Sequence, residues 1–478
     1  MTRLRIFLVN VGLRQPFYPL VAPPLGILCL AAYLRSKLAA DIRLINQRLN
    51  NDPNEWIVRQ IVDFDSDVVG LSSMTTGGYL LRDLTQKIRD ALPGTLIVLG
   101  GPHASAAEGK LLEESPADVV VPGEGERSFE DVIRTRFDGG TLADVPGIFW
   151  RDEDNQIILN QGPVRRITDL DCLPPPAYDL IDLPDYWRRQ SILPIPRRPP
   201  YLSLFSSRGC PYHCNFCHHI FGKKYVGQSA EHIVDEIEFF SRQYDLKEIE
   251  FFDDVFNLDK ERLFEFSDLV QKRGLRLKIA FPNGLRVDIL TEEAIDSLVR
   301  AGMYYSICPL ESGSSRIQEL MGKRLNIPRF LDNVELMAKR GVFINGCAIL
   351  GFPTETEEEL RLTVDTLCES QAHTGLLFTA TPFPNTDLYR TAEKIRPEAL
   401  KQLRYDGMDL SGLFVNLSDV PDHVLLRYQR MGNLKFFMNP KRIVRLLRAY
   451  PRPHLLPLYL PIYLRKVTKG LMSRKVCT

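Results

Sequence analysis

Two long stretches of the chain alternate short β-like segments with amphipathic segments of helical period. In residues 4–137 the β-like segments are LRIFLVNVG, DIRLINQ, DVVGLSS, TLIVLGG and DVVVPGE, and helical stretches such as 25–38 and 79–92 separate them. Strands in regular alternation with helices indicate a parallel sheet that is covered on both faces. We therefore predict a doubly wound α/β domain in residues 1–138.

The alternation resumes at Tyr201. Six further β-like segments follow: YLSLFSS, EIEFFDD, LKIAFPNG, YSICPLES, FINGCAILG and GLLFTATPF. Six βα units in roughly 190 residues predict a partial (β/α)6 barrel over 201–395, with its site at the carboxyl ends of the strands. The intervening residues 139–200 are rich in proline, as in CLPPPAYDLIDLP and LPIPRRPP. They predict a linker with some β-structure.

Composition and cysteine usage favour a cytoplasmic protein. Apolar residues make up 44% of the chain and charged residues 25%, which is typical of a globular protein. Nine cysteines, an odd number with three in one turn, do not resemble a secreted disulfide framework. No signal peptide is evident, and the longest apolar run, LVAPPLGILCLAAYL, is shorter than the ~20 residues that a membrane span needs.

Three cysteines directly follow the first strand of the predicted barrel, with the spacing Cys210-x3-Cys214-x2-Cys217. Thiolates select zinc, copper or iron–sulfur clusters. A structural zinc site would need a fourth ligand, for which the nearest candidates are His213, His218 and His219. A four-iron cluster on three thiolates would keep one iron free of protein ligands, as a catalytic site requires. The spacing alone leaves both alternatives open.

With Phe216 before its last cysteine, this motif resembles that of the radical S-adenosylmethionine (SAM) enzymes. The resemblance implies a catalytic 4Fe-4S cluster on Cys210, Cys214 and Cys217, whose open iron chelates SAM, and a 5′-deoxyadenosyl radical that removes hydrogen from a substrate carbon. It also implies SAM contacts at the later strand ends. The SAM-binding residues would be Phe216, Asp253, Asp254, Asn283, Arg286, Glu311, Ser312 and Gly351. The strand YSICPLES departs from the family pattern, because Cys308-Pro309 replaces the small, glycine-containing residues expected there.

The segments PPLGILCLAAYLR, GGPHAS and GEGE, followed by LPPPAYDL, resemble the cobalamin-binding branch of that family. This branch includes the hopanoid C-methylases and the anaerobic magnesium-protoporphyrin monomethyl ester cyclase. The resemblance implies a flavodoxin-like domain that binds cobalamin at its strand ends. The cobalamin-binding residues would be Ser72, Ser73, Thr75, Gly100, Gly101, His103, Gly123, Glu124 and Gly125. The Asp-x-His-x-x-Gly motif is missing and His103 is the first histidine of the chain, which excludes a histidine ligand to cobalt from the usual loop.

The C-terminal region, residues 396–478, is predicted to be basic and mostly helical. After Asp422 it holds thirteen Lys or Arg residues and no acidic residue. A basic amphipathic segment is typical of membrane-surface binding, where each cation near an anionic leaflet contributes about 1 kcal/mol. The alternative is a helix that packs across the barrel. The high apolar content disfavours nucleic acid as a partner.

These patterns together predict a cobalamin-dependent radical SAM enzyme. The favoured activity is C-methylation of an unactivated carbon in a lipid-like, polycyclic or natural-product substrate. One alternative is an oxidative cyclase or a rearrangement enzyme without methyl transfer, and another is a non-catalytic regulatory module that binds cobalamin or zinc. Expected partners are the substrate, a reductant such as flavodoxin or ferredoxin, and the inner membrane surface through the basic tail.

Overall fold

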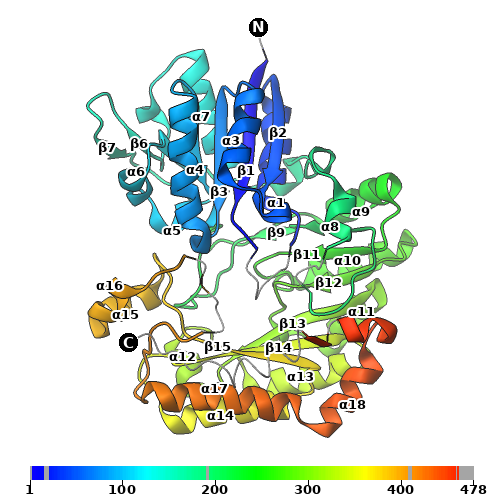
Figure 1. The fold of residues 1–478 in the computed structure, drawn as a ribbon. Coiled ribbons are helices and arrows are strands. Elements are labelled where there is room, and N and C mark those ends of the chain that lie inside the picture. Colours follow the sequence, from blue (N-terminus) through cyan, green and yellow to red (C-terminus); the bar gives the residue numbers. More distant parts are fainter. Residues whose placement is uncertain are drawn as a thin grey trace. The chain divides into compact units, whose positions relative to one another are not determined.

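The computed structural model describes residues 3–14, 21–189, 193–406, 408, 412–458 and 460–461. Two compact units share the chain (Figure 1). The first contains residues 1–190 with 218–227 and 404–409. The second contains residues 191–217 with 228–403 and 410–478.

A seven-stranded sheet forms the centre of the N-terminal unit, in the order β2-β1-β3-β4-β5-β6-β7. The first five of these strands in the sheet are parallel, and β6 and β7 pair in antiparallel fashion. The strands are β1 (Leu4–Val11), β2 (Ala40–Asn46), β3 (Val68–Ser73), β4 (Leu96–Gly100), β5 (Val119–Val120), β6 (Phe149–Arg151) and β7 (Ile157–Leu159). The order 2-1-3-4-5 is that of flavodoxin-like sheets, so the predicted fold class of this unit is confirmed. Strands β6 and β7 lie in the stretch that was predicted to be a linker with some β-structure.

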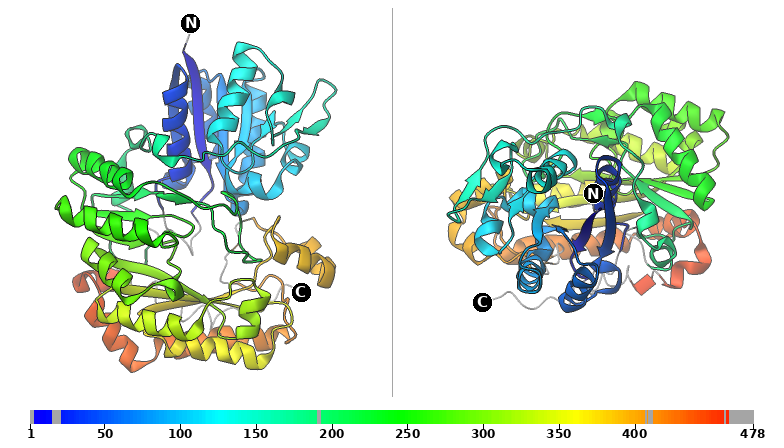
Figure 2. Two further views of the ribbon diagram at one scale, coloured as in Figure 1. Left: turned by 180° about the vertical axis from the view of Figure 1, so that it is seen from behind. Right: turned by 90° about the horizontal axis from the view of Figure 1, so that it is seen from above.

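Helices cover both faces of this sheet (Figures 1 and 2), because its buried strands carry apolar side chains on both faces. In β1, Ile6 and Leu8 belong to one core, and Phe7 and Val9 belong to the other. Helices α1 (Leu25–Lys37) and α7 (Glu126–Asp138) contribute to the first core. Helices α3 (Asn54–Asp63), α4 (Gly78–Ala91), α5 (Gly101–Ala107) and α6 (Lys110–Glu114) contribute to the second. The short helices α2 (Gln47–Asn50) and α8 (Leu183–Trp187) complete the unit.

Six parallel strands form the sheet of the second unit, in the order β15-β14-β13-β12-β11-β8. They are β8 (Tyr201–Leu204), β11 (Glu248–Phe251), β12 (Lys278–Phe281), β13 (Met303–Glu311), β14 (Phe343–Leu350) and β15 (Thr374–Thr379). Two two-residue strands, β9 (Ser207–Arg208) and β10 (Val226–Gly227), stand apart from both sheets. Each predicted β-like segment of this region contains one strand of the sheet, and the prediction of a partial (β/α)6 barrel is confirmed.

Helices follow each strand of the barrel sheet, and several of them begin at polar capping residues. The helices are α9 (Ala230–Tyr244), α10 (Lys260–Lys272), α11 (Glu292–Ala301), α12 (Ser315–Leu320), α13 (Ile327–Lys339), α14 (Glu357–Glu369), α15 (Asp387–Ile395) and α16 (Pro397–Gln402). Ser229, Asp259 and Thr291 accept backbone N–H groups at the starts of α9, α10 and α11. Thr356 and Glu359 form a capping box at α14.

The two C-terminal helices, α17 (Asp422–Phe437) and α18 (Pro440–Ala449), pack on the barrel, with α17 beside α14 and β15 (Figure 1). Buried Arg442 anchors α18: its guanidinium donates to the carbonyls of Ala372, Phe436, Cys368 and Ser370. Packing across the barrel is therefore observed for this part of the basic region. The part of the predicted tail from residue 462 onward lies outside the described residues.

Of the helices that the structure describes, none combines the length and the apolar character needed to cross a bilayer.

The carboxyl group of Glu236 on α9 should make the stability of the protein depend on pH. Burial raises its pKa to about 8. The folded protein therefore keeps this proton up to about pH 8, whereas the unfolded chain releases it near the ordinary value of 4.5. The free energy of unfolding should consequently fall as the pH rises across that interval.

Replacing Glu236 by Gln should remove this dependence and stabilise the protein by about 1–3 kcal/mol at pH 9, with little effect at pH 4. Urea denaturation of the full chain at several pH values measures the free energy of unfolding of each variant. Glu265→Gln, at an exposed position of α10, is the matched control and should leave the pH profile unchanged. Equal profiles for the wild type and Glu236→Gln would contradict the expectation.

Candidate active site

The cysteine loop, residues 210–217, follows β8 and β9 at the carboxyl edge of the barrel sheet. Its backbone closes in a turn in which the N–H of Cys217 donates to the carbonyl of Cys214 at 3.2 Å. Cys217 is exposed, and Cys210 and Cys214 are half-buried. Burial raises the pKa of the Cys214 thiol, whereas the charges of Lys323 and Arg286 lower it. The loop thus presents three thiols at the strand ends, a donor set that fits an iron–sulfur cluster.

The histidines next to the loop were the candidates for a fourth zinc ligand. Nε2 of His219 contacts the ammonium group of Lys223. Burial lowers the pKa of His218. Within the described ranges, no three His, Cys, Asp or Glu side chains converge as the ligands of one metal ion would.

A second segment, residues 320–326, lies against the cysteine loop, and we call it the bracing segment. The backbone N–H of Asn215 donates to the carbonyl of Met321 at 2.9 Å, and its side-chain amide donates to the preceding carbonyl at 3.1 Å. Gly322 has a φ of +73°, and a β-carbon there would lie 2.3 Å from the carbonyl oxygen of His213. Glycine at 322 therefore lets the two segments approach each other.

The adjacent acids Asp253 and Asp254 follow β11 but point to different surroundings. Asp253 is buried, and its carboxylate accepts hydrogen bonds from the N–H and hydroxyl of Ser206 at 2.7 and 2.6 Å and from the hydroxyl of Ser207 at 2.6 Å. Arg262 lies 3.7 Å from the same carboxylate. Asp254 is exposed and accepts the N–H of Gly209 at 3.1 Å. Asp253 thus ties β11 to the start of the cysteine loop, and Asp254 presents its carboxylate at the surface of the site.

Glu311 ends β13 with a φ of +64°, an unusual conformation for a residue with a side chain. Its carboxylate pairs with the ammonium of Lys323 at 3.0 Å, and Lys323 also donates to the carbonyl of Pro309 at 2.7 Å. The pairing of β13 with β14 shifts register between Pro309 and Glu311. The unusual Cys308-Pro309 sequence is thus accommodated by an irregularity that precedes Glu311, because proline cannot donate to the ladder.

Ser312 and Gly351 complete the strand-end residues of β13 and β14. Ser312 is fully buried, and its hydroxyl lies 3.1 Å from that of Thr363 on α14. Gly351 has a φ of +91°, and its N–H donates to Oε2 of Glu355 at 2.6 Å. Burial raises the pKa of Glu355 to about 7. Ser312 therefore packs inward, whereas Gly351 forms a tight turn that buried Glu355 holds.

Aromatic rings join this turn to the cysteine loop. Phe216 contacts Phe352 edge-on, with ring centroids 5.7 Å apart. Phe216 is one of the residues predicted to bind SAM, and Phe352 directly follows Gly351. The contact places the predicted aromatic residue beside the predicted glycine turn.

Asn283 and Arg286 lie in the loop after β12. Exposed Asn283 donates to the carbonyl of Asp253 at 2.9 Å. The guanidinium of Arg286 lies against the ring of Tyr212, 3.8 Å from its centroid, and pairs with Asp288 at 3.1 Å. The predicted SAM-binding residues thus reach the carboxyl edge of the sheet from five strands. Asp253 and Ser312 are buried there, and Arg286 has its guanidinium between Tyr212 and Asp288.

In the N-terminal unit, the predicted cobalamin-binding residues follow β3, β4 and β5. His103 is buried, and within the described residues neither of its ring nitrogens has a hydrogen-bond partner. A β-carbon at Gly78 would lie 2.5 Å from its Nε2. Gly101 has a φ of +80°, and a β-carbon there would lie 2.1 Å from the hydroxyl oxygen of Ser72. Unpaired imidazole nitrogens among closely packed glycines suit a polar ligand at these strand ends, and so these residues fit cobalamin.

The other residues of this set have roles in the local structure. Ser73 is buried and donates to the carbonyl of Met74 at 2.7 Å, and Thr75 is buried in the turn that follows. Gly123, with a φ of +73°, donates its N–H to the hydroxyl of Ser105 at 2.8 Å. Buried Glu124 accepts the N–H of Ile167 at 3.2 Å. Gly100 and Gly125 precede α5 and α7.

Sequence reasoning did not identify Lys323, Tyr212, Asp288 or Glu355. Lys323, Tyr212 and Asp288 act through contacts with residues of other segments, and no periodic pattern marks such residues. Only Glu355 carries a signal, because it lies four residues after Gly351 in the segment ILGFPTET, whose glycine alone attracts attention in the sequence.

Fold and site together define an α/β protein of two units. At the strand ends of its partial barrel, a loop presents three thiols, which are soft ligands for metals. A family model described as the B12 binding domain matches residues 18–133. A second, described as the radical SAM superfamily, matches residues 204–367. The chain therefore belongs to the cobalamin-binding radical SAM enzymes, and the predicted cofactors, cobalamin, SAM and a 4Fe-4S cluster, are those that these two domains imply.

Curated relatives align over most of the chain. An uncharacterized methyltransferase of Pyrococcus horikoshii is 28% identical over 88% of this chain and 89% of its own length. The anaerobic magnesium-protoporphyrin IX monomethyl ester cyclase of Rubrivivax gelatinosus is 24% identical over 87% of this chain and 74% of its own length. The solved cobalamin-dependent SAM radical enzyme OxsB shares the fold, with a TM-score of 0.66 and 20% identity over 84% of this chain. The chain spans only 56% of the length of OxsB.

Changing Gly322 to Ala should displace the cysteine loop, because the new methyl group would overlap the carbonyl of His213. We expect less iron per chain after anaerobic reconstitution than in the wild type. Gly274→Ala is the matched control, since Gly274 has a φ of +66° and a β-carbon there would meet no described atom within 4 Å. It should cost only backbone strain, about 1–3 kcal/mol, and keep its iron. Normal iron content in Gly322→Ala would show that the loop does not depend on this contact.

Proposed function

We propose that this protein is a C-methyltransferase that acts on an unactivated carbon of a lipid-like, polycyclic or natural-product substrate. The observation that carries the proposal is the gathering of the cysteine loop, Asp254, Glu311 and Gly351 at one edge of the barrel sheet, in a chain that also has a B12-binding domain. When bound, SAM and the cluster supply a 5′-deoxyadenosyl radical for hydrogen abstraction, and methylcobalamin supplies the methyl group.

The residues of the barrel would bind and orient SAM. Cys210, Cys214 and Cys217 hold the cluster. Exposed Asp254 and Asn283 offer a carboxylate and an amide oxygen to the methionyl ammonium group, since both groups accept hydrogen bonds from a cation. Glu311, fixed by Lys323, adds a polar contact to SAM. Phe216 and the turn at Gly351 contact the adenine.

Asp253 and Ser312 would support this site from behind. Their polar atoms already bond to Ser206, Ser207 and Thr363. They keep the strand ends in place, and the neighbouring Asp254 and Glu311 contact the ligand. Arg286 also has protein partners and is discussed below.

The N-terminal unit would bind cobalamin at the ends of β3, β4 and β5. Ser72, Ser73, Thr75, Gly100 and Gly101 line the crevice for the nucleotide tail, with Gly123, Glu124 and Gly125 beside it. His103 donates or accepts a hydrogen bond there, which satisfies a ring that has no partner among the described residues.

An oxidative cyclase or rearrangement enzyme is the second candidate, because the cyclase of Rubrivivax gelatinosus is a relative over 87% of this chain. The products distinguish the two. Methyl transfer would use two SAM molecules: one would be cleaved to methionine and 5′-deoxyadenosine, and a second would restore the methyl group of cobalamin and leave as S-adenosylhomocysteine. Cyclisation would release 5′-deoxyadenosine without S-adenosylhomocysteine. Both candidates need an electron donor such as flavodoxin or ferredoxin, and the reducing cytoplasm supplies such donors.

Changing Cys210, Cys214 or Cys217 to Ala should abolish cluster binding and SAM cleavage, because each thiolate holds one iron of the cluster. Anaerobic reconstitution followed by iron and sulfide assays and by chromatography of nucleosides measures both properties. Cobalamin binding should remain, since the B12-binding domain is a separate part of the chain. Exposed Cys172→Ala is the control and should retain all three properties. SAM cleavage in all three loop variants would refute the assignment.

The outer face of α18 supports peripheral contact with an anionic membrane surface. Ile443, Val444 and Leu447 are 39%, 46% and 49% exposed, and Lys441 and Arg448 are exposed beside them. The apolar side chains can enter the headgroup region while the cations contact anionic lipids. No acidic residue follows Asp422 to oppose this attraction. A lipid-like substrate would be reached from such a surface.

Replacing Ile443, Val444 and Leu447 by Gln should weaken sedimentation of the full-length protein with vesicles of phosphatidylcholine and phosphatidylglycerol. The wild type should bind these vesicles better than vesicles of phosphatidylcholine alone, and added salt should weaken the binding. The matched control is Phe239→Gln with Arg242→Gln, an exposed apolar and cationic pair on α9. Equal sedimentation of the wild type and the triple variant would contradict membrane contact through α18.

A further inference from the structure

We propose that Arg286 is a positioning residue for the cysteine loop: it joins Tyr212 of that loop to the bracing segment and so fixes where the cluster lies. The sequence had suggested a different role, a direct contact with SAM. The inference rests on the proposed function, because it assumes that the loop holds the cluster.

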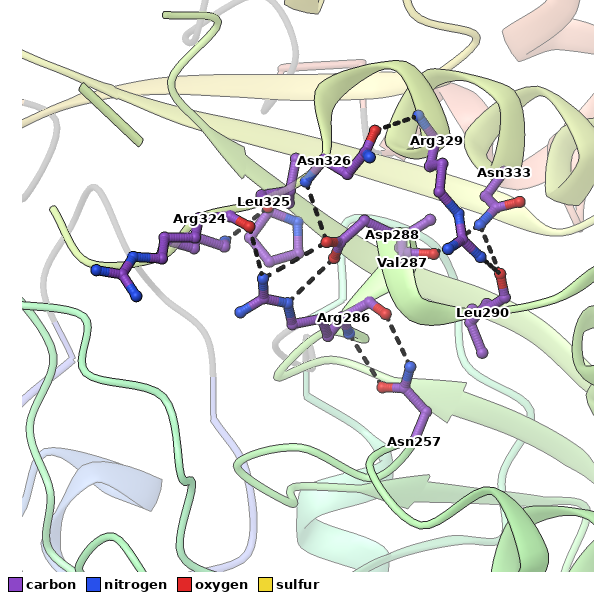
Figure 3. Close-up of polar contacts among 12 residues, drawn as sticks. Asn257, Arg286, Val287, Asp288, Leu290, Arg324, Leu325, Asn326, Arg329 and Asn333 are labelled. Carbon is purple, nitrogen blue, oxygen red and sulfur yellow. Dashed lines mark hydrogen bonds and ion pairs between the residues drawn. The ribbon is translucent and has the colours of Figure 1, made fainter. Parts of the chain in front are cut away.

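Hydrogen bonds hold the backbone of Arg286 in place independently of its side-chain contacts. Its N–H donates to Oδ1 of Asn257 at 3.0 Å, and the amide of Asn257 donates back to its carbonyl at 2.8 Å (Figure 3). Asn257 is 1% exposed and follows β11. The pair of bonds thus holds the loop after β12 to the loop after β11.

The edge of the Arg286 guanidinium bonds to two partners (Figure 3). Nε donates to Oδ1 of Asp288 at 3.1 Å, and Nη2 donates to the carbonyl of Arg324 at 3.2 Å. Oδ2 of buried Asp288 accepts the N–H of Asn326 at 3.1 Å. Arg324 and Asn326 belong to the bracing segment, so Arg286 and Asp288 hold the end of that segment together.

The flat face of the same guanidinium lies against the ring of Tyr212, 3.8 Å from the centroid. Tyr212 lies between Cys210 and Cys214. A guanidinium can stack on an aromatic ring while its edge donates hydrogen bonds, and the point charge of lysine cannot do both in this geometry. Arg286 therefore connects the cysteine loop to the bracing segment in a way that only arginine allows.

The bracing segment also contacts the far part of the loop, through Met321 and Asn215. The loop is consequently held on both sides of Cys214 by one segment. Two ion pairs lie beside the loop: Lys323 pairs with Glu311 at 3.0 Å, and Arg286 pairs with Asp288 at 3.1 Å. Removing the charge of Arg286 leaves Asp288 without its cation, and an unbalanced negative charge near a cluster disfavours the reduced, more negative state.

The test compares Arg286→Lys and Arg286→Gln with the wild type as full-length, reconstituted protein. Three properties are measured: the midpoint potential of the cluster, its electron paramagnetic resonance (EPR) spectrum, and the kinetics of SAM cleavage, expressed as kcat and KM. Arg329→Lys is the matched control, because the guanidinium of Arg329 donates to the carbonyl of Leu290, at the opposite end of the drawn network from Arg324 (Figure 3).

We expect a more negative potential for Arg286→Gln, with a KM for SAM within about twofold of the wild type. Arg286→Lys keeps the charge and should keep the potential, but it should broaden the EPR spectrum because the stack on Tyr212 is lost. A rise in KM of about tenfold with an unchanged potential would instead show direct SAM binding and overturn the proposal. So would variants that match the wild type in all three properties. A wild type without any cluster would refute the proposed function itself.

Tyr212→Leu alone covers the case in which Arg286 variants do not fold, and a double-mutant cycle extends the test where they do fold. Tyr212→Leu removes the stacking ring at a half-buried surface position and leaves the Arg286–Asp288 pair intact. It should broaden the EPR spectrum as Arg286→Lys does. The double variant should add little to either single variant if the two residues act as one contact. Additive effects of the two changes, or a normal spectrum in Tyr212→Leu, would overturn the proposal.

Discussion

The buried carboxylate of Asp253 determines where the site can form. A charge in the interior must be paired and hydrogen-bonded, and Asp253 meets this requirement with Ser206, Ser207 and Arg262. Those bonds join the end of β11 to the residues that lead into the cysteine loop. Because the chain is held at Ser206 and Ser207, it next passes Asp254, whose carboxylate accepts the N–H of Gly209. The other strand ends then add their side chains around a loop whose start is fixed.

The fold could be predicted from the sequence because both sheets are parallel in their main part and each connection is local. A strand of β-branched residues followed by an amphipathic helix is visible in a window of about thirty residues, and handedness and burial leave few arrangements for such units. The cysteine spacing was visible for the same reason, since all three ligands lie in one loop. The short strands β6 and β7 were predicted only as some β-structure in a linker, and their pairing with β5 could not be foreseen from so weak a pattern.

The direction of individual side chains at the strand ends could not be predicted. Asp253 and Asp254 are neighbours of the same type, and only the hydroxyls of Ser206 and Ser207, 47 and 46 residues away, decide that Asp253 is the buried one. Glu311 and Ser312 are both buried, but a positive φ at Glu311 turns the chain, and no pattern in the sequence marks this turn. Beyond the end of a strand, side chains no longer alternate between the two faces of the sheet. Contacts between distant loops, such as that of Arg286 with Tyr212, then decide where the side chains point.

Arg442 and Lys441 show why a count of charges could not separate packing from membrane contact. The two cations are adjacent in α18, yet Arg442 is 2% exposed with four backbone carbonyls around it, and Lys441 is exposed. A helix turns by about 100° per residue, so one basic segment can anchor itself with one face and present the other. Packing on the barrel therefore does not compete with a surface role. The packing of α18 on the barrel fixes which face of the helix is exposed, and that face carries Ile443, Val444 and Leu447.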